Sequence, residues 1–107
     1  QRDADRGDRL MTSEVQITRW RDLPSMVMAR SGEEQVKVLL PPRYQEAIDE
    51  AAMRLGESSA EDYLAGWARS AWMPHSAAPE SAVAEVAAAL EDEWDQTRIA
   101  AYLDALV

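Results

Sequence analysis

The segment Val36–Trp72 constrains the fold more than any other part of the chain, because an apolar run leads through two prolines into a repeating apolar pattern. Residues 42–55 have the spacing of an amphipathic helix, with charged residues on the opposite face. Pro42 suits a first helical turn, and Gly56 suits the position just past a helix end. We therefore predict a helix whose core face consists of Tyr44, Ala47, Ile48, Ala51 and Leu55.

A second helix is predicted after Gly56. Ser58 with Glu61, and Ser59 with Asp62, have the spacing of a helix-capping box. Two helices joined by such a short turn pack against each other. The apolar positions of the second helix are Ala60, Tyr63, Leu64, Trp67 and Ala71. We expect the core shared by the two helices to contain Ile48, Leu55, Leu64 and Trp67.

Three short segments before the prolines have strand character. Residues 15–21, 26–30 and 35–40 are rich in β-branched, aromatic and other apolar residues, and turn-forming residues separate them. Short strands with tight connections favour an antiparallel sheet covered by helices on one face. The sequence thus predicts an α+β fold, in which a three-stranded antiparallel β-meander is followed by a helical hairpin and a C-terminal helical arm (β-β-β-α-α-α).

The composition changes along the chain and suggests four regions. Residues 1–14 are predicted to be a disordered leader, residues 15–72 an α+β core domain, and residues 73–79, with two prolines, a linker. Residues 80–107 form the helical arm, and the phase of its apolar residues slips near Asp95, which predicts a bend. Such an arm either folds back on its own domain or docks on a partner.

The charge of the chain disfavours two classes of partner. There are 20 acidic and 11 basic residues, which give a net charge of −9. Binding to nucleic acid or to anionic lipid normally requires clustered Lys and Arg, so we expect no membrane binding and consider nucleic acid unfavoured. No apolar run approaches the ~20 residues of a membrane span. The absence of cysteine fits a cytoplasmic protein.

No group of residues in the sequence indicates catalysis, a metal or a cofactor. His75 is the single histidine, and it has no second ligand or base at a suggestive spacing. The acidic residues 91–95 match no calcium loop and are expected to be a solvated helix face. We therefore expect a non-catalytic protein without a cofactor.

The expected activity is binding to another protein. A tryptophan and an arginine at a strand end can form a docking anchor; the alternative is that Trp20 closes the core and that Arg21 and Asp22 form a salt bridge in the turn. Methionines 26, 28 and 53 are expected to fill the core, with an adaptable partner surface as the alternative. The predicted partner-binding residues are Trp20, Arg21 and Asp22 at the strand end, Arg43 on the first helix, and Trp94, Tyr102 and Leu103 on the arm.

Several uncommon residues recur in an order that resembles a known family. The segments WRDLPSMVMARSG, LPPRYQEAIDEAAMRLG, AEDYLAGWARS and ALEDEWDQTRIAAYL are similar to those of the small bacterial "virulence factor" domain family, over residues 15–107. Trp67-Ala68-Arg69 departs from the Trp-Arg pair usual there. Genes of that family often lie beside those of methylenetetrahydrofolate reductase and corrinoid methyltransferase proteins. The resemblance therefore implies an accessory subunit, in a hetero-oligomer with a larger folate- or corrinoid-dependent enzyme of one-carbon metabolism.

A DNA-binding regulator of the ribbon-helix-helix class is the alternative function. A strand over residues 35–40 followed by two capped helices has that order of elements, and Gln35, Lys37 and Leu39 would then contact the bases. Two observations weaken this alternative. The chain is acidic, and the two preceding strands can occupy the edge that dimerisation requires.

Overall fold

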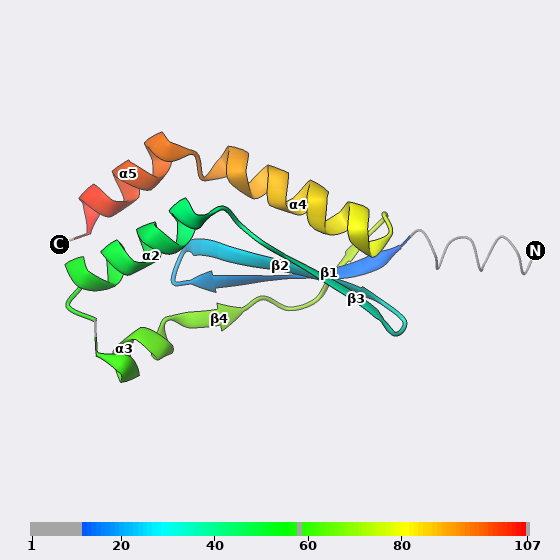
Figure 1. The fold of residues 1–107 in the computed structure, drawn as a ribbon, viewed down its shortest axis with the longest axis horizontal. Coiled ribbons are helices and arrows are strands. Elements are labelled where there is room, and N and C mark those ends of the chain that lie inside the picture. The colour runs from blue at the N-terminus through cyan, green and yellow to red at the C-terminus, as the bar shows by residue number, and fades with distance from the viewer. Residues whose placement is uncertain (1–11, 58, 107) are drawn as a thin grey trace, which may run out of the picture.

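A computed structural model shows an antiparallel sheet with helices along one side and at one end (Figure 1), and it describes residues 12–57 and 59–106. The predicted α+β class with an antiparallel sheet is confirmed, but the predicted element order is only partly right. Nine elements follow one another in the order β-β-β-α-α-β-β-α-α. They are β1 (Ser13–Trp20), β2 (Leu23–Ser31), β3 (Glu34–Leu39), α2 (Pro42–Arg54), α3 (Ala60–Ala65), β4 (Trp67–Arg69), β5 (Met73–His75), α4 (Pro79–Glu93) and α5 (Gln96–Ala105).

The sheet is built around β1, which has partners on both edges. The strand order is β3-β2-β1-β4. β5 also pairs with β1, next to a different part of that strand from β4. β4 lies opposite Thr18–Trp20, and β5 lies opposite Ser13–Val15. Of the predicted leader, residues 1–11 lie outside the described residues, whereas Ser13 and Glu14 belong to β1.

The structure differs from the sequence predictions for residues 66–79 in two places. The second helix ends at Ala65, although its predicted apolar positions extended to Ala71, and residues 73–79, predicted to be a linker, contain β5. Backbone pairing explains both differences, because the second edge of β1 would otherwise carry unpaired N–H and C=O groups. The hydroxyl of Ser70 between the two short strands accepts from the Ile17 amide at 3.0 Å, which fixes the connection to β1.

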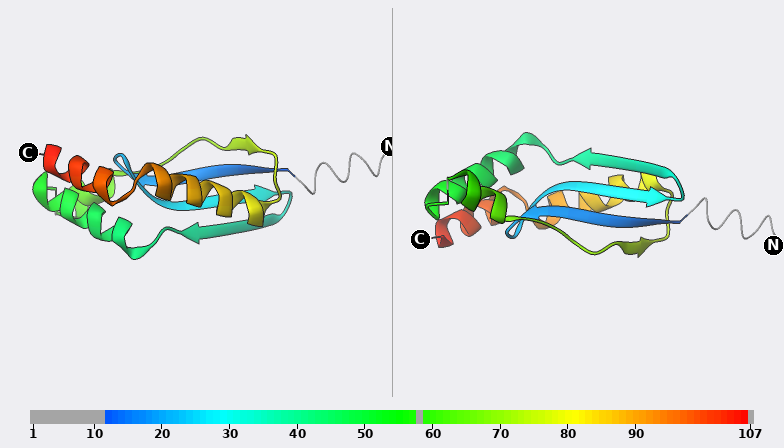
Figure 2. Two further views of the ribbon diagram at one scale, coloured as in Figure 1. Left: turned by 90° about the horizontal axis from the view of Figure 1, so that it is seen from above. Right: turned by 90° about the horizontal axis from the view of Figure 1, so that it is seen from below.

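The helices cover one face of the sheet. α4 runs along this face and contacts all three long strands, while α2 and α5 pack together at one end of the sheet (Figures 1 and 2). Val83, Ala87 and Leu90 of α4 are buried there. The arm formed by α4 and α5 therefore folds back on its own domain, and the predicted bend lies between Glu93 and Gln96.

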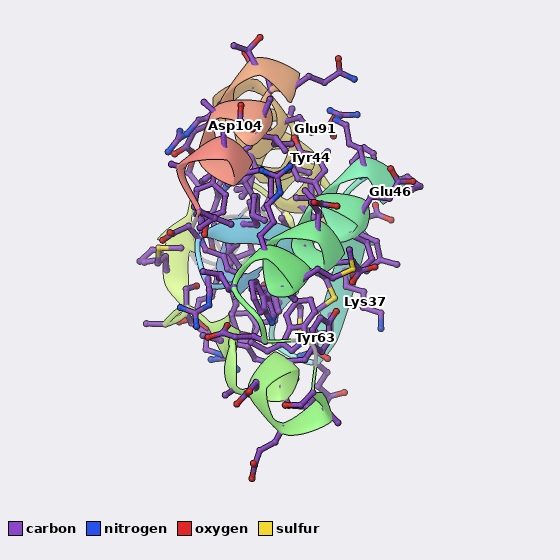
Figure 3. All side chains as sticks on the ribbon, turned by 90° about the vertical axis from the view of Figure 1, so that its left-hand side faces the viewer. Lys37, Tyr44, Glu46, Tyr63, Glu91 and Asp104 are labelled. Carbon is purple, nitrogen blue, oxygen red and sulfur yellow. The ribbon has the colours of Figure 1, made fainter. Side chains whose placement is uncertain are left out.

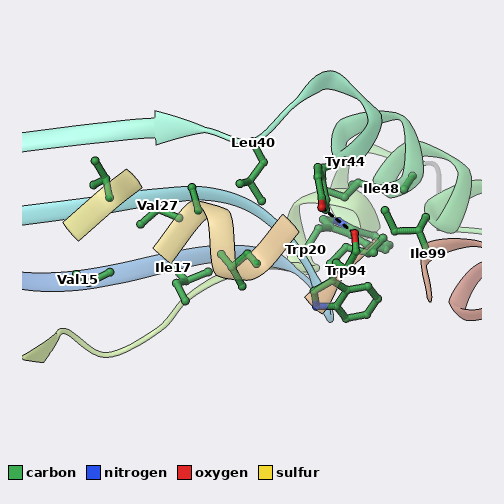
Figure 4. Packing of buried hydrophobic residues seen from close by; sticks show 14 of the residues in the cluster. Val15, Ile17, Trp20, Val27, Leu40, Tyr44, Ile48, Trp94 and Ile99 are labelled. Carbon is green, nitrogen blue, oxygen red and sulfur yellow. Dashed lines mark hydrogen bonds between the residues drawn. The ribbon is translucent and has the colours of Figure 1, made fainter. Parts of the chain in front are cut away.

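The core is continuous from the sheet to the helices (Figure 4). Ile48 is fully buried, and Leu55 and Trp67 are half-buried against the core, as predicted. Leu64 is 67% exposed, so its predicted core position was wrong. The reason is that α3 has only 6 residues and buries none of them fully.

Candidate functional site

Trp20, predicted as an exposed anchor, lies in the core. Its side chain has 0% exposure, and its indole Nε1 donates to the Tyr63 carbonyl at 2.7 Å. Simple alternation places Trp20 on the face opposite to Val15, but a β-bulge between Thr18 and Arg19 shifts the phase by one residue. The alternative interpretation, that Trp20 closes the core, is the one that agrees with the structure.

The next two residues form the exposed turn between β1 and β2. Arg21 has a φ of 53°, and its N–H donates to the Gly66 carbonyl at 2.8 Å. Its guanidinium donates twice to the Glu57 carboxylate, one of these bonds being 2.9 Å long, and this raises the pKa of Arg21. The expected salt bridge between Arg21 and Asp22 is thus replaced by one to Glu57, which ties the turn to the end of α2.

The remaining predicted site residues make mostly internal contacts. Trp94 is 4% exposed, and its carbonyl accepts from the Tyr44 hydroxyl at 2.7 Å (Figure 4). Tyr102 meets the Trp94 ring edge-on at a centroid distance of 5.4 Å. Leu103 is half-buried against the core. Arg43 is 3.5 Å from the Glu91 carboxylate, which joins α2 to α4.

A hollow of about 560 Å³ separates the β1–β2 turn from α5. It brings together Asp22, Trp94 and Tyr102, which lie in distant parts of the sequence. All three were predicted from the sequence to bind a partner. Burial raises the pKa of Tyr102, and the nearby Asp22 carboxylate raises it further. Two arginines and two acidic residues line the hollow, so its charges balance. The lining residues are Arg19, Asp22, Glu93, Trp94, Arg98, Ala101 and Tyr102.

The two arginines of the hollow are engaged with the protein itself. Arg19 Nη1 donates to the Asp22 carbonyl at 3.1 Å. Arg98 lies 4.1 Å from the centre of the Trp94 ring and 3.3 Å from the Glu93 carboxylate. The hollow is therefore electrically balanced and offers an incoming charged ligand few uncommitted groups.

A second surface, missed by sequence reasoning, is the face of the sheet opposite to α4. No described helix covers its three long strands on that side, as the view from below in Figure 2 shows. We define this open face by the side chains that alternate with the buried ones. They are Glu14, Gln16 and Thr18 of β1, Met26, Met28 and Arg30 of β2, and Gln35, Lys37 and Leu39 of β3.

The open face is partly apolar. Leu39 is 70% exposed, and Met26, the residue paired with it across the two strands, is half-buried. Met28 is also half-buried on this face. Outside the open face, Met53 of α2 was also predicted to fill the core, but it is 63% exposed. The sequence did contain a signal for this face. Met26 and Met28 alternate along β2 with the buried Val27 and Ala29, and Leu39 follows the half-buried Val38 along β3.

The same face carries positive charge on an acidic chain. Arg30 lies 3.9 Å from the centre of the Trp72 ring and 3.0 Å from Glu14, so Trp72 lies beside the open face. Arg69 pairs opposite Thr18 and extends the open face onto β4. Among the described residues, the open face with Arg69 carries three cations, Arg30, Lys37 and Arg69, and one carboxylate, Glu14, whereas the whole chain carries −9. Figure 3 shows Lys37 well away from Glu91 and Asp104 of the helical layer.

The described residues contain neither a metal cluster nor a membrane-spanning helix. Within residues 12–57 and 59–106, no three His, Asp or Glu side chains lie where they could hold a metal ion together. None of the helices in those ranges has the length and apolar character needed to cross a membrane.

Fold and surfaces together define a small α+β domain in which the described helices leave one sheet face open and the C-terminal helices pack on the other. The chain belongs to the family described as "Virulence factor", whose family model matches residues 18–103. No curated protein and no solved structure matches it. The family expected from the sequence is thus confirmed.

Proposed function

We propose that this protein is a non-catalytic accessory subunit that binds a larger protein through the open face of its sheet. The observation that carries the proposal is the apolar strip formed on the open face by the exposed Leu39 and the half-buried Met26 and Met28. A folate- or corrinoid-dependent enzyme of one-carbon metabolism, such as methylenetetrahydrofolate reductase, is the first candidate partner, because the family resemblance implies it.

The composition of the open face supports a protein partner. When an antiparallel sheet has one solvated face, that face normally carries polar side chains, so apolar residues there are unusual. Methionine and arginine are enriched in protein interfaces, and methionine adapts its shape to a partner. The Arg30 guanidinium is already stacked on Trp72, so this cation is held in place before a partner arrives.

The position of the site differs from the one expected from sequence. Trp20 and Trp94 are buried and stabilise the domain, so the proposal assigns them no direct contact with the partner. Arg21 and Asp22 remain exposed at the end of the sheet. They can contribute only to the rim of an interface that extends around the β1–β2 turn.

The ribbon-helix-helix alternative has one observation in its favour. Gln35, Lys37 and Leu39 all project from the same exposed side of β3. Against it, β3 pairs along its length with β2, and the second helix, α3, has only 6 residues. The accessory-subunit proposal therefore has the better support.

Affinity purification of the chain from its native host, followed by mass spectrometry, tests the proposal. We expect a larger protein to be recovered in a fixed ratio. Leu39→Ser should reduce that recovery, because it removes the most exposed apolar side chain of the open face. Leu64→Ser is the matched control, since Leu64 is 67% exposed and belongs to α3 and not to the strands that form the open face.

Equal recovery of the partner with both variants would contradict docking on the open face. Recovery of the chain alone from wild-type extracts would contradict the accessory-subunit proposal itself. A folate- or corrinoid-dependent enzyme among the recovered proteins would support the more specific assignment, and its absence would contradict only that assignment.

A further inference from the structure

The edge of the sheet at β3 has backbone groups that point away from the described strands. β3 is the last strand in the order β3-β2-β1-β4. The Leu40 amide donates to the Ser25 carbonyl of β2 at 2.9 Å, and hydrogen-bonding direction alternates along an antiparallel strand. It follows that the amides and carbonyls of Gln35, Lys37 and Leu39 point outward from the edge.

The side chains of the same three residues lie on the open face. A shallow hollow of about 260 Å³ lies beside them, lined by Met28, Gln35, Val36 and Lys37. An exposed edge next to side-chain pockets is the arrangement by which a sheet accepts an added strand: backbone hydrogen bonds supply affinity, and the pockets supply specificity.

We propose that the edge of β3 receives an extended segment of the partner in which carboxylate side chains alternate with apolar ones. The inference rests on the proposed function and adds to it the chemistry of the partner. Charge selects the occupant, because Lys37 projects from the edge strand and no described carboxylate pairs with it, whereas Arg30 on the strand beside it is already paired with Glu14. Because side chains alternate along a strand, the carboxylates of the added strand would lie on the open face and its apolar side chains on the other face, next to the half-buried Val36 and Val38.

A second copy of the chain is a poorer occupant of this edge. Two β3 strands related by a two-fold axis perpendicular to the sheet would place both open faces on the same side. Each face carries Lys37 on the strand that forms the new contact, so the two lysines would approach one another. An acidic segment has the opposite sign and avoids this repulsion.

A titration of the ¹⁵N-labelled full chain with defined peptides tests the inference. The probes are an end-blocked peptide of alternating Glu and Val and a matched peptide of alternating Lys and Val. We expect the acidic peptide to shift the amide signals of Gln35, Lys37 and Leu39 and to slow their hydrogen exchange. The basic peptide should bind more weakly.

Two variants separate the backbone contribution from the charge contribution. Gln35→Pro removes one outward N–H and leaves the ladder to β2, because proline is tolerated on a strand edge whose N–H faces solvent; affinity should fall about two- to tenfold. Lys37→Gln keeps the backbone and should weaken binding about two- to fivefold. Leu64→Ser is the control and should bind like the wild type.

Three results would overturn the inference. These are equal binding of the two peptides, shifts confined to another surface, or no shift with millimolar acidic peptide. A dimer in sedimentation experiments that Gln35→Pro dissociates would assign the edge to a second copy instead, and stronger shifts with a single-stranded oligonucleotide would assign it to nucleic acid. If the partner co-purifies with Gln35→Pro and Lys37→Gln as with wild type but is lost with Leu39→Ser, the proposed function stands and the strand-addition inference fails.

Discussion

The close contact between Trp20 and Gly66 holds the turn end of the sheet against α3. A Cβ atom added at Gly66 would lie 2.5 Å from the Trp20 ring, so the indole fits only against a glycine. Tyr63 stacks on the same indole at 5.9 Å, and its other neighbour is Trp67, which meets it edge-on at 5.9 Å. Gly66 thus has a packing role, although glycine at a helix end is usually explained by backbone conformation.

Gly66→Ala should destabilise the protein by about 1–3 kcal/mol, because the added methyl group overpacks the site. The φ of Gly66 is −77°, so the backbone itself accepts alanine. Urea unfolding measures the change. Gly56→Ala is the comparison, because Gly56 has a φ of 71° and nothing within 4 Å of an added Cβ.

A double-mutant cycle distinguishes packing from backbone strain at these two glycines. Trp20→Phe makes room beside Gly66 and should recover part of the loss caused by Gly66→Ala. The same change should leave the cost of Gly56→Ala unaltered. Additive effects of Trp20→Phe and Gly66→Ala would show that the two residues do not compete for the same space.

At the scale of elements, α5 depends on few contacts for its position. Ile99 is its one buried residue among those described. At the other end of the helix, the Leu103 carbonyl accepts from Arg54 of α2 at 2.8 Å. Its first turn is capped by Asp95, whose carboxylate accepts from the Arg98 amide at 2.8 Å. α5 is therefore well defined locally, and it is attached to the domain through the buried Ile99, the half-buried Tyr102 and Leu103, and the hydrogen bond from Arg54.

Ile99→Ala should detach α5 and leave the sheet intact. We expect a loss of about 2–5 kcal/mol if α5 unfolds together with the rest of the protein. If α5 opens first, amide exchange should accelerate in residues 96–105 and remain slow in β1 and β2. Exchange measured by mass spectrometry separates these cases, and Thr97→Ala, at an exposed position of the same helix, is the control. Unchanged exchange in α5 would contradict this role of Ile99.

For the whole molecule, the sequence predicted the class, the three long strands and the first helix, because their apolar periodicities are clear. It did not predict β4 and β5. These strands have three residues each, and only the unpaired edge of β1 determines that they are extended. The helical interpretation of Trp67 was reasonable locally, since its spacing from Tyr63 and Leu64 fits one face of a helix.

The prediction that Trp20 is an exposed anchor was wrong for a related reason. Bulges such as the one between Thr18 and Arg19 arise from pairing between strands. The change in the sheet face to which the Trp20 side chain points therefore has no signature in the sequence of β1 itself. The open face required knowledge of which side of the sheet α4 covers. Sequence patterns predicted which residues alternate but not which side would remain without a helix.

The stability of the whole domain should fall at alkaline pH because of one buried phenol, Tyr44, and one half-buried phenol, Tyr102. Burial raises the pKa of Tyr44 and of Tyr102 in the folded protein above the usual value of about 10. The folded state then holds these protons more tightly than the unfolded state does. Their contribution is complete below about pH 10 and is lost as the pH rises through the folded-state pKa values.

Urea unfolding over an alkaline pH series checks this expectation. Tyr44→Phe should lower stability at neutral pH by about 1 kcal/mol, because the Trp94 carbonyl loses its hydrogen-bond donor. Above about pH 10 the variant should lose stability less steeply than wild type, since one titrating phenol is gone. Parallel pH profiles would contradict the assignment to Tyr44.

The central position of β1 also determines the order in which the protein can be completed during synthesis. β2 follows β1 directly, but the bond from the Ile17 amide to the Ser70 hydroxyl joins residues 53 positions apart. On the ribosome, the second edge of β1 therefore stays open until residues 67–75 have emerged, and α4 follows later still. An open, apolar strand edge favours aggregation, so nascent chains truncated before Trp67 should be the ones most dependent on chaperones.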